Sequence, residues 1–174
     1  ISDAMKSYKV SKAPSLRFLF AHPAHLIACG FGSGLSPFAP GTFGTLFAWL
    51  SYPVLRSYLA DVELLTFLAA CSVIGIFAVQ RTGRDLGAVD HGSIVWDEIV
   101  PFWLVLFFCP LGFAWQTAAF LAFRFFDIVK PPPARFFDER VKNGFGVMAD
   151  DFVAGAYSVL VLIALQWLLA KFGA

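Results

Sequence analysis

Apolar residues gather in long runs along this chain, and three of these runs approach the length of a membrane-spanning helix. They extend from Phe43 to Leu59, from Leu64 to Gln80 and from Phe152 to Ala170. A helix needs about 20 mainly apolar residues to cross a bilayer. A fourth apolar region, Gly92 to Phe126, is long enough for two crossings, and Cys109 to Gly112 supplies Pro and Gly for a turn between them. The pattern predicts about five membrane helices, two of which form a short hairpin.

The region before the first run has a different character. Phe18 to Gly30 is short and contains His22, Pro23 and His25, so we expect it to lie at the interface or to pack against the bundle without crossing. The basic segment 1–17 has no apolar core of its own and does not resemble a removable signal peptide. We therefore expect an all-α, polytopic integral membrane helical bundle in a single domain, 1–174, with an N-terminal interfacial or non-spanning helix.

The composition supports a membrane protein. Of the 174 residues, 59% are hydrophobic and 14% are charged, and the mean hydropathy is +0.73, which is far from the profile of an average soluble domain. The net charge of +1 gives no indication of a nucleic-acid partner. Cys29, Cys71 and Cys109 are widely spaced in apolar stretches, a pattern typical of small buried residues and not of a disulfide framework or a zinc site.

The positions of Lys and Arg favour the hairpin over one long span. A single span would place Asp97 and Asp127 on opposite faces of the membrane, whereas a hairpin leaves only Arg56 and Lys171 on the side that is poor in basic residues. The positive-inside rule assigns the other, basic side to the cytoplasm. That side also has every acid except Asp61 and Glu63, and its basic residues are Lys6, Lys9, Lys12, Arg17, Arg81, Arg84, Arg124, Lys130, Arg135, Arg140 and Lys142.

Five acids on this side lie beside apolar runs. Asp97 and Glu98 fall inside the first helix of the predicted hairpin, and Asp127 follows its second helix. Asp150 and Asp151 precede the last apolar run. Ionised groups near hydrocarbon usually pair, bind a metal or line a functional path because burying them is costly. One acid is enough to cap a helix, and a second beside it adds repulsion unless a cation is close. Carboxylates without a set of Cys or His favour magnesium or manganese.

Two further features suit a phosphate. Arg124, Asp127 and Lys130 recur at steps of three, along one helix face before three prolines end the helix; they also suit a simple ladder of surface ion pairs. Gly30 to Leu46 is rich in Gly and Pro, and Thr42 is the predicted N-cap of the following helix. A helix N-terminus behind such a loop offers N–H groups to an anion, although an ordinary capped helix has the same pattern. Together with the acids, these features favour phosphoryl chemistry on a membrane-embedded substrate.

Other polar residues of this side are less informative. Asp138, Glu139 and Arg140 are typical of solvated loop charges. Asp90 and His91 fit plain interfacial residues as well as they fit ligands.

Four motifs in this order resemble the phosphatidylglycerophosphatase A family of bacterial inner-membrane lipid phosphatases: GSGLSPFAPGTFGTL, DHGSIVWDE, FRFFDIVKPPPARFFDER and NGFGVMADDFVAG. The resemblance covers the chain from about Gly30 to about Gly155. It implies a magnesium-dependent enzyme that removes the terminal phosphate of phosphatidylglycerophosphate and releases phosphatidylglycerol and phosphate. One departure is Pro101, since the family usually has Gly shortly after the Asp-Glu pair.

The resemblance also implies roles for particular residues. Two mechanisms stay open, attack by a metal-activated water with a carboxylate as base, and attack by an Asp that forms an acyl phosphate. The residues implied in binding the phosphate are Arg124, Lys130, Arg135, Thr42, Gly41 and Gly44. The acids implied in metal binding and catalysis, with Lys130 as a further catalytic residue, are Asp97, Glu98, Asp127, Asp150 and Asp151.

Two other hypotheses compete with an enzyme. An ion-coupled transporter or channel component would also use intramembrane carboxylates, but it predicts acids near the bilayer midplane and broken helices in paired halves. Here the acids gather on one predicted face, and the sequence shows no inverted repeat. A structural subunit would use its charges only to anchor helix ends. The lipid bilayer and a phospholipid substrate are the expected partners.

Overall fold

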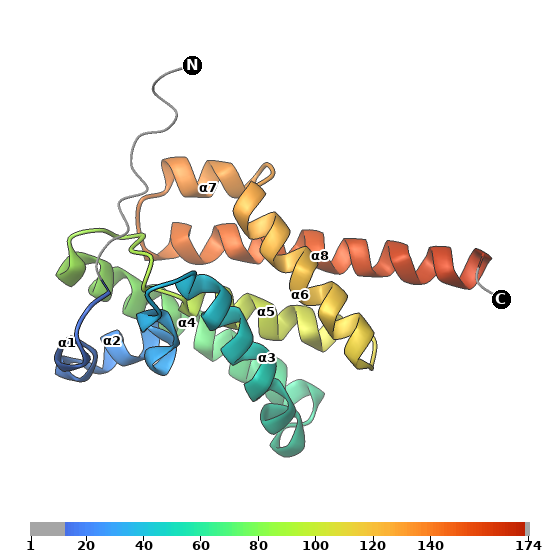
Figure 1. Ribbon diagram of the computed structural model, residues 1–174, viewed down its shortest axis with the longest axis horizontal. Helices are drawn as coiled ribbons and strands as arrows, with labels where there is room; N and C mark the ends of the chain where they lie inside the picture. Colours follow the sequence, from blue (N-terminus) through green and yellow to red (C-terminus); the bar gives the residue numbers. More distant parts are fainter. Residues whose placement is uncertain (1–12, 173–174) are drawn as a thin grey trace.

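The computed structural model describes residues 13–172, which form helices joined by short connections and no strand (Figure 1). The expected all-α class is confirmed for this part of the chain, while most of the basic segment 1–17 lies outside it. The elements are α1 (Leu16–Ala21), α2 (Pro23–Ala28), the 3-10 helix η1 (Gly30–Leu35), α3 (Pro40–Tyr58), α4 (Asp61–Leu86), α5 (Trp96–Phe108), α6 (Phe113–Val129), α7 (Ala134–Arg140) and α8 (Gly144–Phe172).

Each apolar run of the sequence forms a helix. α3, α4 and α8 cover the three single runs, and the fourth region is divided into α5 and α6 at residues 109–112, as the hairpin predicts. α4 and α8, with 26 and 29 residues, are long and apolar enough to cross a bilayer by length and composition. α5 has 13 residues, or about 20 Å of helix, which is less than the hydrocarbon thickness of about 30 Å. Membrane crossing by α3, α5 and α6 therefore stays a prediction.

The N-terminal segment forms two short helices where the sequence predicts one. The His22 side chain caps the first turn of α2, which begins at Pro23. With six residues each, α1 and α2 are about 9 Å long and too short to span a membrane. The buried ring of His25 has one nitrogen 2.9 Å from the carbonyl oxygen of Phe18 and the other 2.8 Å from Asp85 Oδ2. His25 thus ties both short helices to the end of α4.

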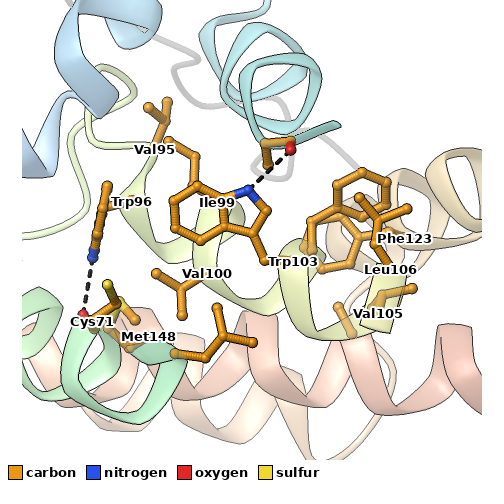
Figure 2. Close-up of a cluster of buried hydrophobic side chains, with 14 of the residues drawn as sticks. Cys71, Val95, Trp96, Ile99, Val100, Trp103, Val105, Leu106, Phe123 and Met148 are labelled. Atoms are coloured by element: carbon orange, nitrogen blue, oxygen red, sulfur yellow. Dashed lines mark hydrogen bonds between the residues drawn. The ribbon is translucent and has the colours of Figure 1, made fainter. Parts of the chain in front are cut away.

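Helix α5 lies at the centre of the bundle. It contacts α2, α3, α4, α6 and α8, and nine of its 13 residues are buried, so most of its surface is covered by other helices. Trp96 Nε1 donates to the carbonyl of Cys71 in α4 at 3.1 Å, and Trp103 Nε1 donates to the carbonyl of Ala48 in α3 at 2.9 Å (Figure 2). These bonds satisfy indole N–H groups that burial would otherwise leave unpaired. They fix α5, and with it the acids of its first turn, against two neighbouring helices.

Two glycines allow the neighbouring helices to approach α5 closely. A Cβ atom at Gly44 of α3 would lie 2.7 Å from Val95 Cβ, so this residue, which the resemblance implies in phosphate binding, has a packing role. A Cβ atom at Gly75 of α4 would lie 2.6 Å from Trp96 Cδ1. Both contacts are shorter than real side chains allow, so the helix spacing depends on glycine at these positions.

We expect Gly75→Ala to lower the free energy of unfolding by about 1–3 kcal/mol, because the added methyl group must displace the buried indole of Trp96. Thermal unfolding in detergent micelles measures the change. The matched control is Ala70→Ser, which adds one atom on the exposed side of the same helix. Equal stability of the two variants would contradict the close approach.

Candidate active site

The acids and cations singled out by the sequence come together at one end of the bundle. This end contains the beginnings of α3, α5 and α8, the end of α6, and α7, toward the left of Figure 1. Asp97, Asp150 and Asp151 are 7%, 5% and 3% exposed, and the side chains of Glu98 and Asp127 are 12% and 13% exposed. Five carboxylates from three helices thus lie almost out of contact with solvent.

Arg124 connects three helices at this end. Its Nη1 forms an ion pair with Glu98 Oε2 on α5 and lies 2.8 Å from Asp127 Oδ2, one turn along α6. The buried hydroxyl of Thr45, on α3, donates to the same Glu98 oxygen at 3.0 Å. Glu98 is therefore held by a cation and a hydroxyl, which compensates part of the cost of burying its charge.

Helix α3 begins against the Glu98 carboxylate. The helix starts at Pro40, after Ala39 in the left-handed conformation (φ 46°), so Thr42 lies inside the first turn and its prediction as N-cap is wrong. Proline is favoured at the first position of a helix because its fixed φ suits that place, and here it starts the helix earlier. A Cβ atom at Gly41 would lie 1.9 Å from Glu98 Oε1. A carboxylate thus faces the N-terminus of α3, whose partial positive charge stabilises it.

Lys130 connects the end of α6 to α7 and α8. It takes the left-handed conformation (φ 48°) after the last residue of α6, so it leaves the helix face that the steps of three predict. Its Nζ lies 2.5 Å from Asp150 Oδ2 and 2.8 Å from Asp138 Oδ1. The expectation that Asp138 is only a solvated loop charge is therefore wrong. Burial acts to lower the pKa of Lys130, but the two carboxylates outweigh it and raise the pKa, so the ammonium group stays charged.

Asp97 and Asp151 lack such a cation. Within residues 13–172, neither side chain forms an ion pair, and Asp97 Oδ1 is buried without a hydrogen-bond partner. The charges that act on these two carboxylates are mainly those of the other acids in the cluster. Five carboxylates and two cations leave an excess of negative charge in a buried place, which is costly unless a further cation neutralises it.

The donor set fits a hard divalent cation. All the candidate ligands are carboxylate oxygens, which Mg²⁺ prefers, and the unpaired oxygen of Asp97 is an available acceptor. In the part of the chain that the structure describes, no three Asp, Glu, His or Cys side chains are already grouped closely enough to hold a metal ion. The two cations hold three of the acids in ion pairs instead. Metal binding would therefore require some carboxylates to rotate away from these cations.

Two other polar residues form no hydrogen bond or ion pair with the carboxylate cluster among the described residues. Arg135, implied in substrate binding, is on the exposed side of α7, where it pairs with Glu139 at 2.7 Å. His91 is buried in the loop before α5, and its Nδ1 accepts a hydrogen bond from the backbone N–H of Ser93 at 3.2 Å. Burial lowers the pKa of His91, which favours the neutral ring that this bond requires. The structure gives His91 a role in shaping its loop.

The sequence analysis missed Thr45. This residue lies one turn after Gly41 on the same face of α3, and its hydroxyl is within hydrogen-bonding distance of both the Gly41 carbonyl and Glu98. The i, i+4 spacing of Gly41 and Thr45 within the glycine-rich motif could have identified it, because this spacing places the hydroxyl on the helix face that lies against Glu98.

Known proteins of similar sequence are lipid phosphatases by name. The model of a family described as phosphatidylglycerophosphatase A matches residues 26–166. A phosphatidylglycerophosphatase A of Haemophilus influenzae is 48% identical over 158 residues, 90% of this chain and 97% of that protein. One of Escherichia coli is 43% identical over 156 residues, 87% and 89% of the two chains. A Bacteroides thetaiotaomicron protein, provisionally named phosphatidylinositol-3-phosphatase, is 41% identical over 151 residues, 83% and 94%. No solved structure matches the chain.

We expect Arg124→Met to lower the free energy of unfolding by about 3–5 kcal/mol, because it leaves Glu98 and Asp127 buried without their cation. Adding Glu98→Gln to this variant should recover part of the loss, since it removes one of the uncompensated charges. Thermal unfolding in micelles measures both changes. Arg81→Met, which breaks an exposed pair with Asp85, is the control, and an equal loss in that variant would contradict the expectation.

Proposed function

Because the chain belongs to the phosphatidylglycerophosphatase A family, a family of phosphatases, we propose that its carboxylate cluster hydrolyses the terminal phosphomonoester of phosphatidylglycerophosphate. The reaction takes place at the cytoplasmic face of the bacterial inner membrane, in a multi-pass protein, with Mg²⁺ as the cofactor. The observation that carries this proposal is the set of five acids, three buried and two partly buried, with only two bonded cations. A divalent cation neutralises part of this excess, and it allows a dianionic phosphate to approach carboxylates that would otherwise repel it.

The five acids form two groups, those that pair with a cation and those that do not. Asp97 and Asp151 have no bonded cation among the described residues, so they are the first candidates to hold Mg²⁺, with Glu98, Asp127 and Asp150 as further ligands. When bound, Mg²⁺ would neutralise phosphoryl oxygens and make water more acidic. The ion pairs of Arg124 and Lys130 would loosen as these acids turn toward the metal.

Arg124 and Lys130 are the groups that bind and orient the phosphate. Both are cations at the end of α6, and both are largely shielded from solvent, with side chains 16% and 28% exposed. A guanidinium binds phosphoryl oxygens in a planar, two-pronged manner, and an ammonium acts as a point charge beside it. Charge–charge attraction to the phosphate is strong here because little water screens it.

One carboxylate of the cluster is either the general base that activates water or the nucleophile itself. In the route that we favour, a carboxylate takes a proton from water, the water oxygen bonds to phosphorus, and the bond from phosphorus to the glycerol oxygen breaks. The glycerol oxygen takes up a proton, so the products are phosphatidylglycerol and inorganic phosphate. In the other route, an Asp attacks phosphorus itself and the acyl phosphate is hydrolysed in a second step.

The orientation follows from the charges at the two ends of the bundle. Arg81, Arg84 and Lys142 lie at the same end as the acids, while Arg56 and Lys171 lie at the other. The positive-inside rule supports a cytoplasmic position for the acid end. The grouping of the acids at one end, away from the middle of the long helices, also favours an enzyme over an ion-coupled transporter or channel component.

We expect phosphate release from phosphatidylglycerophosphate in detergent micelles to require Mg²⁺, to stop with EDTA, and to fall by about 100-fold or more in Asp151→Asn. The matched control is Asp61→Asn, at the far end of the bundle, which should keep full activity in a folded protein. Phosphatidylinositol 3-phosphate is a second substrate to test, because one relative bears that activity in its name. Release that persists in EDTA would contradict the metal, and no release from any phospholipid monoester would favour transport.

We expect Lys130→Met to raise KM for the phosphomonoester by about tenfold or more, since it removes a buried cation from the phosphate site. Lys130→Arg should retain much of the affinity. Because the pKa of Lys130 is raised, its charge persists as the pH rises through the neutral and mildly alkaline range, so its contribution should not decline between about pH 7 and 9. Lys142→Met, on an exposed lysine nearby, is the control, and an equal rise in its KM would contradict the assignment.

A further inference from the structure

An apolar groove of about 370 Å³ runs between α5 and α8. Pro101, Leu104 and Phe108 line it on α5, and Gly155, Ala156 and Leu160 line it on α8. All of its lining residues are apolar. The volume lies within the range of about 300–1,000 Å³ that is usual for binding sites of small molecules.

The groove begins one helical turn from the carboxylate cluster. Pro101 follows Asp97 by four residues on α5, and Gly155 follows Asp151 by four residues on α8. Residues four apart lie on the same face of a helix. Both helices start at the acid end and run away from it in the same direction (Figure 1). The groove therefore leads from the two acids without a bonded cation into the apolar part of the bundle.

The shape of the groove depends on small residues in α8. Gly155 is buried at its floor, where a Cβ atom would lie 3.3 Å from Val105 Cγ2 and 3.7 Å from Pro101 Cβ. Ala156 and Leu160 are exposed at its rim. The floor is thus formed by the close contact of two helices, and the rim is open along the side of the bundle. An elongated molecule can enter such a groove from the bilayer.

We propose that this groove seats one acyl chain of the phospholipid whose phosphate is bound by the carboxylate cluster; the inference rests on the proposed function. From Pro101 to Phe108 the groove follows about 10 Å of helix, or roughly two thirds of one leaflet of a hydrocarbon core about 30 Å thick. A phospholipid with its headgroup at the acids extends its chains in this direction. The continuity of the groove with the acids favours the substrate over a helix of a second copy, which would need no such alignment.

The first test fills the groove. Ala156→Phe places a ring at its rim, and Ala164→Phe places the same ring two turns further along α8, at an exposed position outside the groove. With long-chain phosphatidylglycerophosphate in mixed micelles, we expect KM to rise by about tenfold in Ala156→Phe only. With a dibutanoyl analogue, whose chains are too short to fill the groove, neither variant should change KM.

Several outcomes would overturn the inference. An equal change with both substrates would indicate a distorted site, and an unchanged KM with the long-chain lipid would indicate an empty groove. A smaller oligomer in Ala156→Phe, with KM unchanged, would assign the groove to a second copy of the chain. Absence of hydrolysis in the wild-type protein would contradict the proposed function instead, so the two failures are distinguishable.

The second test does not require turnover. Phosphatidylglycerophosphate with a photoreactive group in the middle of one acyl chain is irradiated with the wild-type protein, and the labelled residues are mapped by mass spectrometry. We expect labelling to concentrate at Leu104, Ala156 and their neighbours and to be lost in Ala156→Phe but not in Ala164→Phe. Labelling spread evenly over the exposed faces of all helices, with no effect of Ala156→Phe, would overturn the inference even in a protein without activity.

Discussion

The burial of two acids at the beginning of the central helix is the constraint on which the rest of the structure depends. Helix α5 is contacted by five other helices, and Asp97 and Glu98 of its first turn have little access to water. A buried carboxylate is tolerated only where cations and hydrogen-bond donors compensate its lost hydration. The surrounding helices supply them unevenly, because Glu98 has Arg124 and Thr45 whereas Asp97 has an oxygen without a partner. If the acids only capped helix ends, each would have its own donors. The unpaired oxygen of Asp97 shows that this is not the case here.

Both cations of the cluster come from the end of α6. Arg124 reaches α5 and α3, while the left-handed conformation of Lys130 turns its side chain toward α7 and α8. One short stretch of chain therefore connects every helix that contributes an acid. In the absence of a phosphate, these cations neutralise three of the acids. In the proposed function, a bound phosphate would take these two cations and a metal ion would take the acids, so one set of charge pairs would replace another.

The sequence predicted the helices and the grouping of the charges because both follow from the alternation of apolar runs with charged connections. The helical hairpin of α5 and α6 returns the chain to the end where it began, so Asp97 and Asp127 lie at the same end of the bundle. Local backbone geometry was harder to predict from the sequence. Pro40 starts α3 before Thr42, and Lys130 leaves the helix that its spacing continues. Asp138 and Thr45 enter the network through contacts with distant residues, which no local pattern can specify.

Pro101 connects the chemistry of the site with the packing below it. Proline cannot donate a backbone hydrogen bond to the residue four positions earlier, and here that residue is Asp97. Helix α5 nevertheless continues to Phe108, because packing against the neighbouring helices holds it in place. The ring of Pro101 is short, so it lines the groove without filling it, and a Gly at this place would leave the space open as well. A long side chain would close the space directly below the acids. Pro101 is therefore compatible with the proposed groove, because it keeps a small volume on the side that faces Gly155.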